Sequence, residues 1–220
     1  MNTRYLQVVK NREFSKKERD VFSGYLGFAP KSIVDKIPLR FDKIILDVSC
    51  GFGSVLSYLL KKGRTVYGLD ITSQYLEKEE LKEYFIKADA HHLPFKDDSL
   101  DAIFCFEVVE HLNMPDKFLK EAKRTLKVKG IFLITTPTPT SHQLPKAGYT
   151  QHISVRERNA WVSKLKELGF KVNIITHTYP VGTSLPSIFS TILTQTVGRA
   201  IGYWKRYADV TSTKLLCTKM

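Results

Sequence analysis

A glycine turn between an apolar run and a helical pattern constrains the fold of this chain more than any other feature. Residues 44–55 read IILDVSCGFGSV, in which the apolar run ends at Asp47 and the turn contains Gly51 and Gly53. Apolar residues then recur at helical spacing, at Val55, Leu56, Leu59 and Leu60. The segment predicts a buried strand, a glycine turn and a helix start. Glycines allow close approach of a ligand to the backbone, and free amides at a helix start favour electron-rich groups.

The rest of the first two thirds of the chain alternates strand and helix patterns. Further strands are predicted at 65–70, 84–89, 100–107 and 131–137, and helices at 73–81 and around Phe118, Leu119, Ala122 and Leu126. This alternation indicates a parallel sheet covered by helices on both faces. Ligands of such sheets bind beyond the carboxyl ends of the strands.

The two ends of the chain have a different character. Residues 1–40 suggest a helical N-terminal appendage. Ser154 and Glu157 form a capping-box pattern that predicts a helix start. Strands are expected at 171–179 and 213–219, separated by an insertion at 180–212 with a strongly amphipathic helical pattern. We interpret residues 1–220 as one domain carrying these two appendages.

Composition sets broad limits on location and partners. The net charge of +12 permits an acidic partner, although an ordinary basic enzyme is the simpler interpretation. The three cysteines have neither metal-ligand spacing nor an even count, which favours a reducing, cytoplasmic compartment. No signal-peptide pattern opens the chain, and the uncharged stretch 181–198 is too polar for a good membrane span.

The glycine turn does not fit two common nucleotide-binding motifs. A dinucleotide fingerprint, G-x-G-x-x-G, needs a small third residue for close helix packing, and Leu56 stands at that position. The turn also lacks the Lys-Ser/Thr pair of a phosphate-binding P-loop.

Several motifs in order resemble the class I S-adenosylmethionine-dependent methyltransferases, in the type 11 branch that includes ubiquinone and menaquinone biosynthesis enzymes. ILDVSCGFG is similar to the first motif of that family, VYGLDIT to the second, and KADAHHLPFKDDSLDAIFCFEVVEHL to the third and fourth; GFKV also has its usual place. The resemblance covers about 44–172. It implies a Rossmann-like α/β three-layer sandwich with a mostly parallel seven-stranded sheet and an antiparallel C-terminal strand.

The resemblance implies a site for S-adenosylmethionine, with S-adenosylhomocysteine as product. Asp47 and the turn would face the amino-acid and ribose portions, Asp70 would accept hydrogen bonds from the ribose hydroxyls, and Asp89 with the Ala90 amide would bind adenine. Ser49 departs from the family pattern because it occupies the first glycine position. The expected cofactor-binding residues are Asp47, Ser49, Cys50, Gly51, Gly53, Asp70, Ile71, Asp89, Ala90, Phe106 and Glu107.

Methyl transfer is an in-line displacement that requires alignment and, for a hydroxyl or protonated amine, a base. His111 and His152 are the candidate catalytic residues, and His91 and His92 are further candidates. A helix-start histidine bonded only to backbone is an equally good interpretation of His111. No metal site is expected, because the histidines and acids lack ligand spacing on a common element.

The acceptor is predicted to be small or lipid-like, because the 180–212 helix can cap an apolar pocket. The same helix can instead pack on the sheet edge, or contact a membrane surface through Arg199, Lys205 and Arg206. Nucleic acid is the alternative acceptor, suggested by the net charge, although the strand end CFEVVEH lacks the signature of base-amine methyltransferases. A non-catalytic S-adenosylmethionine-binding protein is the third hypothesis. The sequence does not indicate an oligomeric state.

Overall fold

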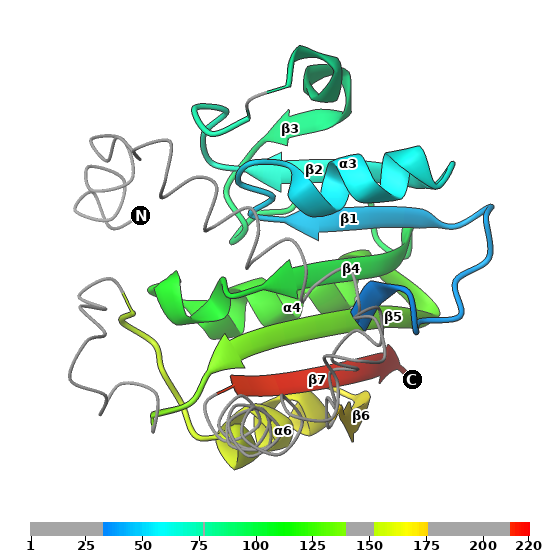
Figure 1. The fold of residues 1–220 in the computed structure, drawn as a ribbon. Helices are drawn as coiled ribbons and strands as arrows, with labels where there is room; N and C mark the ends of the chain where they lie inside the picture. The colour runs from blue at the N-terminus through cyan, green and yellow to red at the C-terminus, as the bar shows by residue number, and fades with distance from the viewer. Residues whose placement is uncertain (1–32, 77, 140–151, 176–211) are drawn as a thin grey trace, which may run out of the picture.

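The computed structural model describes residues 33–76, 78–139, 152–175 and 212–220, and in these it forms a single seven-stranded sheet (Figure 1). The order across the sheet is β3-β2-β1-β4-β5-β7-β6. The strands are β1 (Ile44–Val48), β2 (Thr65–Asp70), β3 (Phe85–Lys87), β4 (Leu100–Phe106), β5 (Leu126–Pro137), β6 (Phe170–Ile174) and β7 (Ser212–Lys219).

Parallel pairing joins the first five strands, and β7 pairs antiparallel with both β5 and β6. The arrowheads of β1, β2, β4 and β5 therefore point to the same edge of the sheet (Figure 1). Since β7 runs the other way, its first residues lie at that edge as well, with Lys214 opposite Thr135. The predicted fold class is confirmed, including the antiparallel C-terminal strand.

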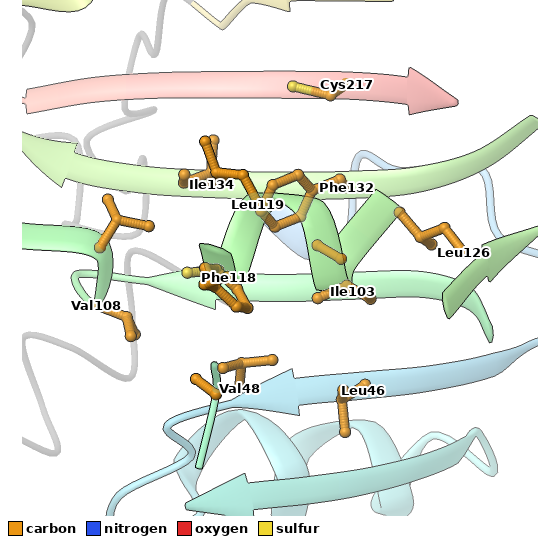
Figure 2. Packing of buried hydrophobic residues seen from close by; sticks show 14 of the residues in the cluster. Leu46, Val48, Ile103, Val108, Phe118, Leu119, Leu126, Phe132, Ile134 and Cys217 are labelled. Atoms are coloured by element: carbon orange, nitrogen blue, oxygen red, sulfur yellow. The ribbon is translucent and has the colours of Figure 1, made fainter. Parts of the chain in front are cut away.

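Side chains along each strand point alternately to the two faces of the sheet, and this divides the core into two layers. Ile45, Ala102 and Leu133 pack with the helix α3 (Ser54–Lys61) on one face. Neighbouring residues such as Leu46, Ile103 and Phe132 point to the other face, where they pack with α4 (Pro115–Thr125) and α6 (Arg158–Glu167). Figure 2 shows Phe118 and Leu119 of α4 lying against these strands. A sheet with helices on both faces is the expected three-layer sandwich.

One predicted helix is wrong. In place of a helix over 73–81, the described residues form a turn and then the 3-10 helix η1 (Glu79–Tyr84). The Thr72 hydroxyl accepts the Gln74 amide (3.1 Å), and the Leu76 amide donates to Ser73 O (3.0 Å). A threonine side chain that accepts nearby amides offers the backbone an alternative to the helix.

The capping box is also wrong. α6 begins at Arg158 with Glu157 as its N-cap, and no side chain caps it. The Ser154 hydroxyl donates instead to Leu112 O at 2.6 Å. That bond attaches the segment before α6 to the chain that follows β4. Ser154 therefore joins these two segments and does not cap the helix.

Strand limits differ from the predictions at their ends. β3 is shorter than 84–89, β4 ends before Glu107, and β5 begins at Leu126, five residues earlier than predicted. Residues 180–211 of the predicted insertion and most of the 1–40 appendage lie outside the described residues, and residue 212 already belongs to β7. Ile33, Val34 and Ile37 of that appendage are described, and they are buried in the α3 layer. No helix in the described part of the chain has the length and apolar character needed to cross a membrane.

Candidate functional site

The turn after β1 has the backbone shape of a ligand-binding loop. Ser49, Gly51 and Gly53 all have positive φ angles, of 53°, 50° and 73°. The Cys50 amide donates to Leu69 O (3.1 Å), and the Gly53 amide donates to Cys50 O (2.8 Å). These bonds hold the turn against the end of β2.

The left-handed conformation explains why glycine is usual at the position of Ser49. Only glycine adopts it without cost, whereas a residue with a Cβ pays roughly 1–2 kcal/mol. Ser49 therefore keeps the geometry of the turn at the expense of local strain. The sequence alone could not show that the turn is retained despite the substitution.

Gly51 leaves space above the turn. An added Cβ there would meet only Ser49 O, at 4.0 Å, so the approach to the backbone is open. Gly53 is different, since its Cβ would come within 2.7 Å of Leu81 and 2.9 Å of Leu76. Gly51 therefore leaves its backbone accessible, whereas Gly53 permits close packing.

Asp70 ends β2 beside this turn with its carboxylate held by backbone amides. Gly51 N donates to Oδ2 (3.1 Å) and Thr72 N donates to Oδ1 (3.2 Å), and the Ile71 amide also contributes. Burial raises the pKa of Asp70, while these amides act to lower it. Each carboxylate oxygen retains a lone pair, so a vicinal diol fits this acceptor pair.

Asp47 lies beneath the turn and is 3% exposed. Burial, assisted by the charge of Asp70, raises its pKa to about 8, and a hydrogen bond from the Leu56 amide acts in the opposite direction. A buried acid of this kind favours a nearby cation, because a positive charge would compensate the ionised carboxylate. Cys50, in the same turn, is buried against Gly68.

Asp89 follows β3 at the same edge. His91 donates its backbone amide to Asp89 Oδ1 (2.9 Å), and His91 Nδ1 lies 2.6 Å from the same oxygen. Partial burial acts to raise the pKa of Asp89, but the His91 contacts lower it overall. Both bonds involve Oδ1, which leaves Oδ2 for a ligand next to the buried Ala90.

The end of β4 supplies Phe106 and Glu107. Phe106 stacks at a tilt on Phe104, with ring centroids 6.1 Å apart. Glu107 has a φ of 54°, and its amide donates to Thr135 O (3.0 Å). Burial raises the pKa of Glu107, against the lowering effects of the Thr135 side chain and Lys214.

The histidines predicted as catalytic lie together. His111 ends the 3-10 turn η2 (Val109–His111), and its ring meets that of His152 at a centroid distance of 4.6 Å and an angle of 80°. Their burial is intermediate. His91 is instead engaged with Asp89, and His92 is exposed and contacts Lys117. Of the four histidines, His111 and His152 form the pair at the site edge.

Glu110, Thr136 and Lys214 also lie at the site edge, in addition to the expected cofactor-binding and catalytic residues. Glu110 is fully buried, and its Oε2 accepts the Thr136 hydroxyl at 3.0 Å. Lys214 is 5% exposed. Polar residues at strand ends were a signal for Glu110 and Thr136, and the antiparallel direction of the last strand would have indicated Lys214.

Comparison with known proteins finds similar sequences and a similar fold. The methyltransferase domain family matches residues 46–134. An uncharacterised protein of Methanocaldococcus jannaschii is 32% identical over 87% of this chain and 86% of its own length. The ubiquinone biosynthesis O-methyltransferase of Rickettsia typhi is 30% identical over 60% of this chain, which spans 56% of that enzyme.

A similar fold occurs in the crystal structure of an S-adenosylmethionine-dependent methyltransferase from Archaeoglobus fulgidus. Its TM-score is 0.62 at 19% identity, with 99% of this chain and 100% of that chain covered. At 19% sequence identity, this similarity shows only that the folds are alike.

Proposed function

Because this chain belongs to the class I S-adenosylmethionine-dependent methyltransferases of the type 11 branch, we propose that it methylates a small or lipid-like acceptor bound beside His111 and His152. Its cofactor is S-adenosylmethionine. The observation that carries the proposed cofactor site is the Asp70 carboxylate, which backbone amides of Gly51 and Thr72 hold at the end of β2.

Three acids divide the recognition of the cofactor in this proposal. Asp70 accepts both ribose hydroxyls, and Asp89 accepts the adenine amino group next to the Ala90 amide. Asp47 attracts the positively charged amino-acid end. The open side of Gly51 supports this arrangement, because the backbone there admits a close ligand.

The acceptor side lies at the ends of β4 and β5. Methyl transfer needs the acceptor atom in line with the sulfonium carbon and shielded from water. His111 and His152 are the candidate bases, since an imidazole titrates near neutral pH. The predicted 180–212 helix would close the pocket over an apolar acceptor.

Several relatives are ubiquinone biosynthesis O-methyltransferases, which supports a small acceptor. A screen with labelled cofactor against quinols, small amines, lipids and RNA tests this. We expect turnover of a quinol or lipid-like compound. Turnover confined to RNA would replace the proposed acceptor class with nucleic acid.

The cofactor site is tested by Asp70→Ala and Asp70→Asn, with S-adenosylhomocysteine binding measured by calorimetry. Two charge-assisted hydrogen bonds at about 1.5–3 kcal/mol each predict an affinity loss of at least roughly 100-fold for the alanine variant. The asparagine variant keeps one oxygen and should lose less. Asp42→Ala is the control, because the Asp42 side chain is 62% exposed and bonded only to Arg40 in the described chain. Unchanged affinity in a folded Asp70→Ala protein would contradict the assignment.

A further inference from the structure

Glu110, His111 and His152 form a compact group of metal-type donors. One ligand atom from each lies within 4.8 Å of the other two, and His111 Nε2 is 3.9 Å from Glu110 Oε1. The sequence could not indicate this group, because 40 positions separate His152 from the other histidine. Its members converge only in the folded chain.

Backbone hydrogen bonds fix this convergence. Glu110 O accepts the amides of Ile153 (2.8 Å) and Ser154 (2.9 Å), and the Ser154 hydroxyl donates to Leu112 O. The segment that carries His152 is thereby attached to the turn that carries Glu110 and His111. A ligand set held by backbone contacts is preorganised, which lowers the entropic cost of binding.

The Glu110 carboxylate has one oxygen in a position to bind a cation. The residue is 0% exposed, and Oε1 has no hydrogen-bond partner among the described residues. A buried carboxylate oxygen without a partner is costly. Oε2 already accepts the Thr136 hydroxyl, which orients the group so that Oε1 lies on the side of the histidines.

We propose that Glu110, His111 and His152 bind one divalent transition-metal ion of the Zn²⁺ type. Two imidazole nitrogens and one carboxylate oxygen suit Zn²⁺ or Co²⁺ better than Mg²⁺, which prefers oxygen ligands. Tetrahedral ligands at about 2.0–2.1 Å from Zn²⁺ lie roughly 3.3 Å apart. Metal binding therefore requires the three ligand atoms, now within 4.8 Å of one another, to move closer together.

Three protein ligands leave a coordination position open, as in catalytic zinc sites. This step rests on the proposed function: a hydroxyl oxygen of the acceptor occupies that position, and His111 and His152 then act as metal ligands in place of their role as candidate bases. The metal lowers the pKa of the hydroxyl, whose proton passes to solvent. The oxygen then forms a bond to the methyl carbon as the carbon–sulfur bond of the sulfonium breaks, which releases the thioether product.

The first test uses the tag-free, chelator-treated full chain titrated with Zn²⁺ by calorimetry and with Co²⁺ by visible absorption, with Mg²⁺ for comparison. We expect one Zn²⁺ or Co²⁺ per chain, bound at least tenfold more tightly than Mg²⁺. His152→Ala and the similarly sized His152→Gln should weaken Zn²⁺ binding at least tenfold. His92→Ala, which removes an exposed histidine outside the group, should leave it unchanged.

The Thr136→Val variant tests the metal site without changing any of the three proposed ligands. It removes the hydroxyl that orients Glu110 and should weaken Zn²⁺ binding by about 10–100-fold, as loss of an outer-shell partner does in other zinc sites. Equal Zn²⁺ affinity in wild type, His152→Ala and Thr136→Val would overturn the inference, as would the absence of binding by the wild type.

S-adenosylhomocysteine binding by the metal-free protein separates the two proposals. Binding of the nucleoside without binding of Zn²⁺ overturns the metal site and leaves the proposed function standing. Failure to bind the nucleoside overturns the proposed cofactor site, whatever the metal result.

Discussion

The buried carboxyl of Asp47 makes a quantitative prediction about pH. Burial raises its pKa from 3.8 to about 8 in the folded chain. Between these values the native state keeps a proton that the unfolded chain releases. The stabilising effect is therefore complete below pH 3.8 and is lost as the pH rises towards 8, at about 1.4 kcal/mol per pH unit. From pH 5 to pH 7 the change is about 3 kcal/mol.

Asp47→Asn isolates this effect. The asparagine is neutral at every pH, and its side-chain oxygen can still accept the Leu56 amide. The free energy of unfolding of the variant, minus that of the wild type, should therefore rise by about 3 kcal/mol from pH 5 to pH 7 and level off above pH 8. Urea unfolding at pH 5, 6, 7 and 8.5 measures this difference.

Groups that do not interact with Asp47 are common to both proteins and cancel in the difference, whereas Asp70, whose charge contributes to the raised pKa of Asp47, is part of the measured effect. Asp42→Asn serves as the matched control, since the Asp42 side chain is 62% exposed. The free energy of unfolding of this variant, minus that of the wild type, should not change between pH 5 and 7. Parallel stability curves for the Asp47→Asn variant and the wild type would refute the reasoning, because they would show that Asp47 is ionised in the folded protein at neutral pH.

Three further substitutions test the turn and its surroundings. Ser49→Gly should raise the free energy of unfolding by about 0.5–1 kcal/mol in urea, because it relieves a φ of 53°; a loss of stability would contradict the strain. Gly53→Ala should cost about 1–3 kcal/mol more than Gly63→Ala, since both have positive φ but only the first Cβ would meet leucine side chains within 2.9 Å; equal costs would remove the packing argument. Arg124→Lys should weaken S-adenosylhomocysteine binding several-fold by calorimetry, because the guanidinium bonds two carbonyl oxygens of loop 91–98 beside the predicted adenine site; unchanged affinity would show that this clamp does not position the site.

The sheet could be predicted because its signals are local. The strand at 65–70 was predicted from the short segment TVYGLD that ends in Asp70, and the structure has these same limits. The helix over 73–81 could not be excluded in this way, since its periodicity is helical and only the Thr72 hydroxyl, bonded to Gln74, shows the alternative.

The candidate site was predictable where it follows strand ends. Asp47, Asp70 and Asp89 were found from their positions after apolar runs, and all three lie at the carboxyl edge of the sheet. The burial of Glu110 and its approach to His152 could not be found, because both depend on contacts between distant parts of the chain. Hydrogen bonds from Ile153 and Ser154 to Glu110 O create that approach, and no periodicity encodes them.

The packing of Cys50 against Gly68 has a practical consequence. All three cysteines are free and buried, and burial, together with nearby carboxylates, raises the pKa of the Cys50 thiol. Because only the thiolate reacts readily, a disulfide reagent should modify Cys50 only when the turn separates from β2. The modification rate then reports how often this loop opens, and protection by a bound nucleoside would measure how firmly the ligand closes it. The chain thus contains a natural chemical probe of its own loop dynamics.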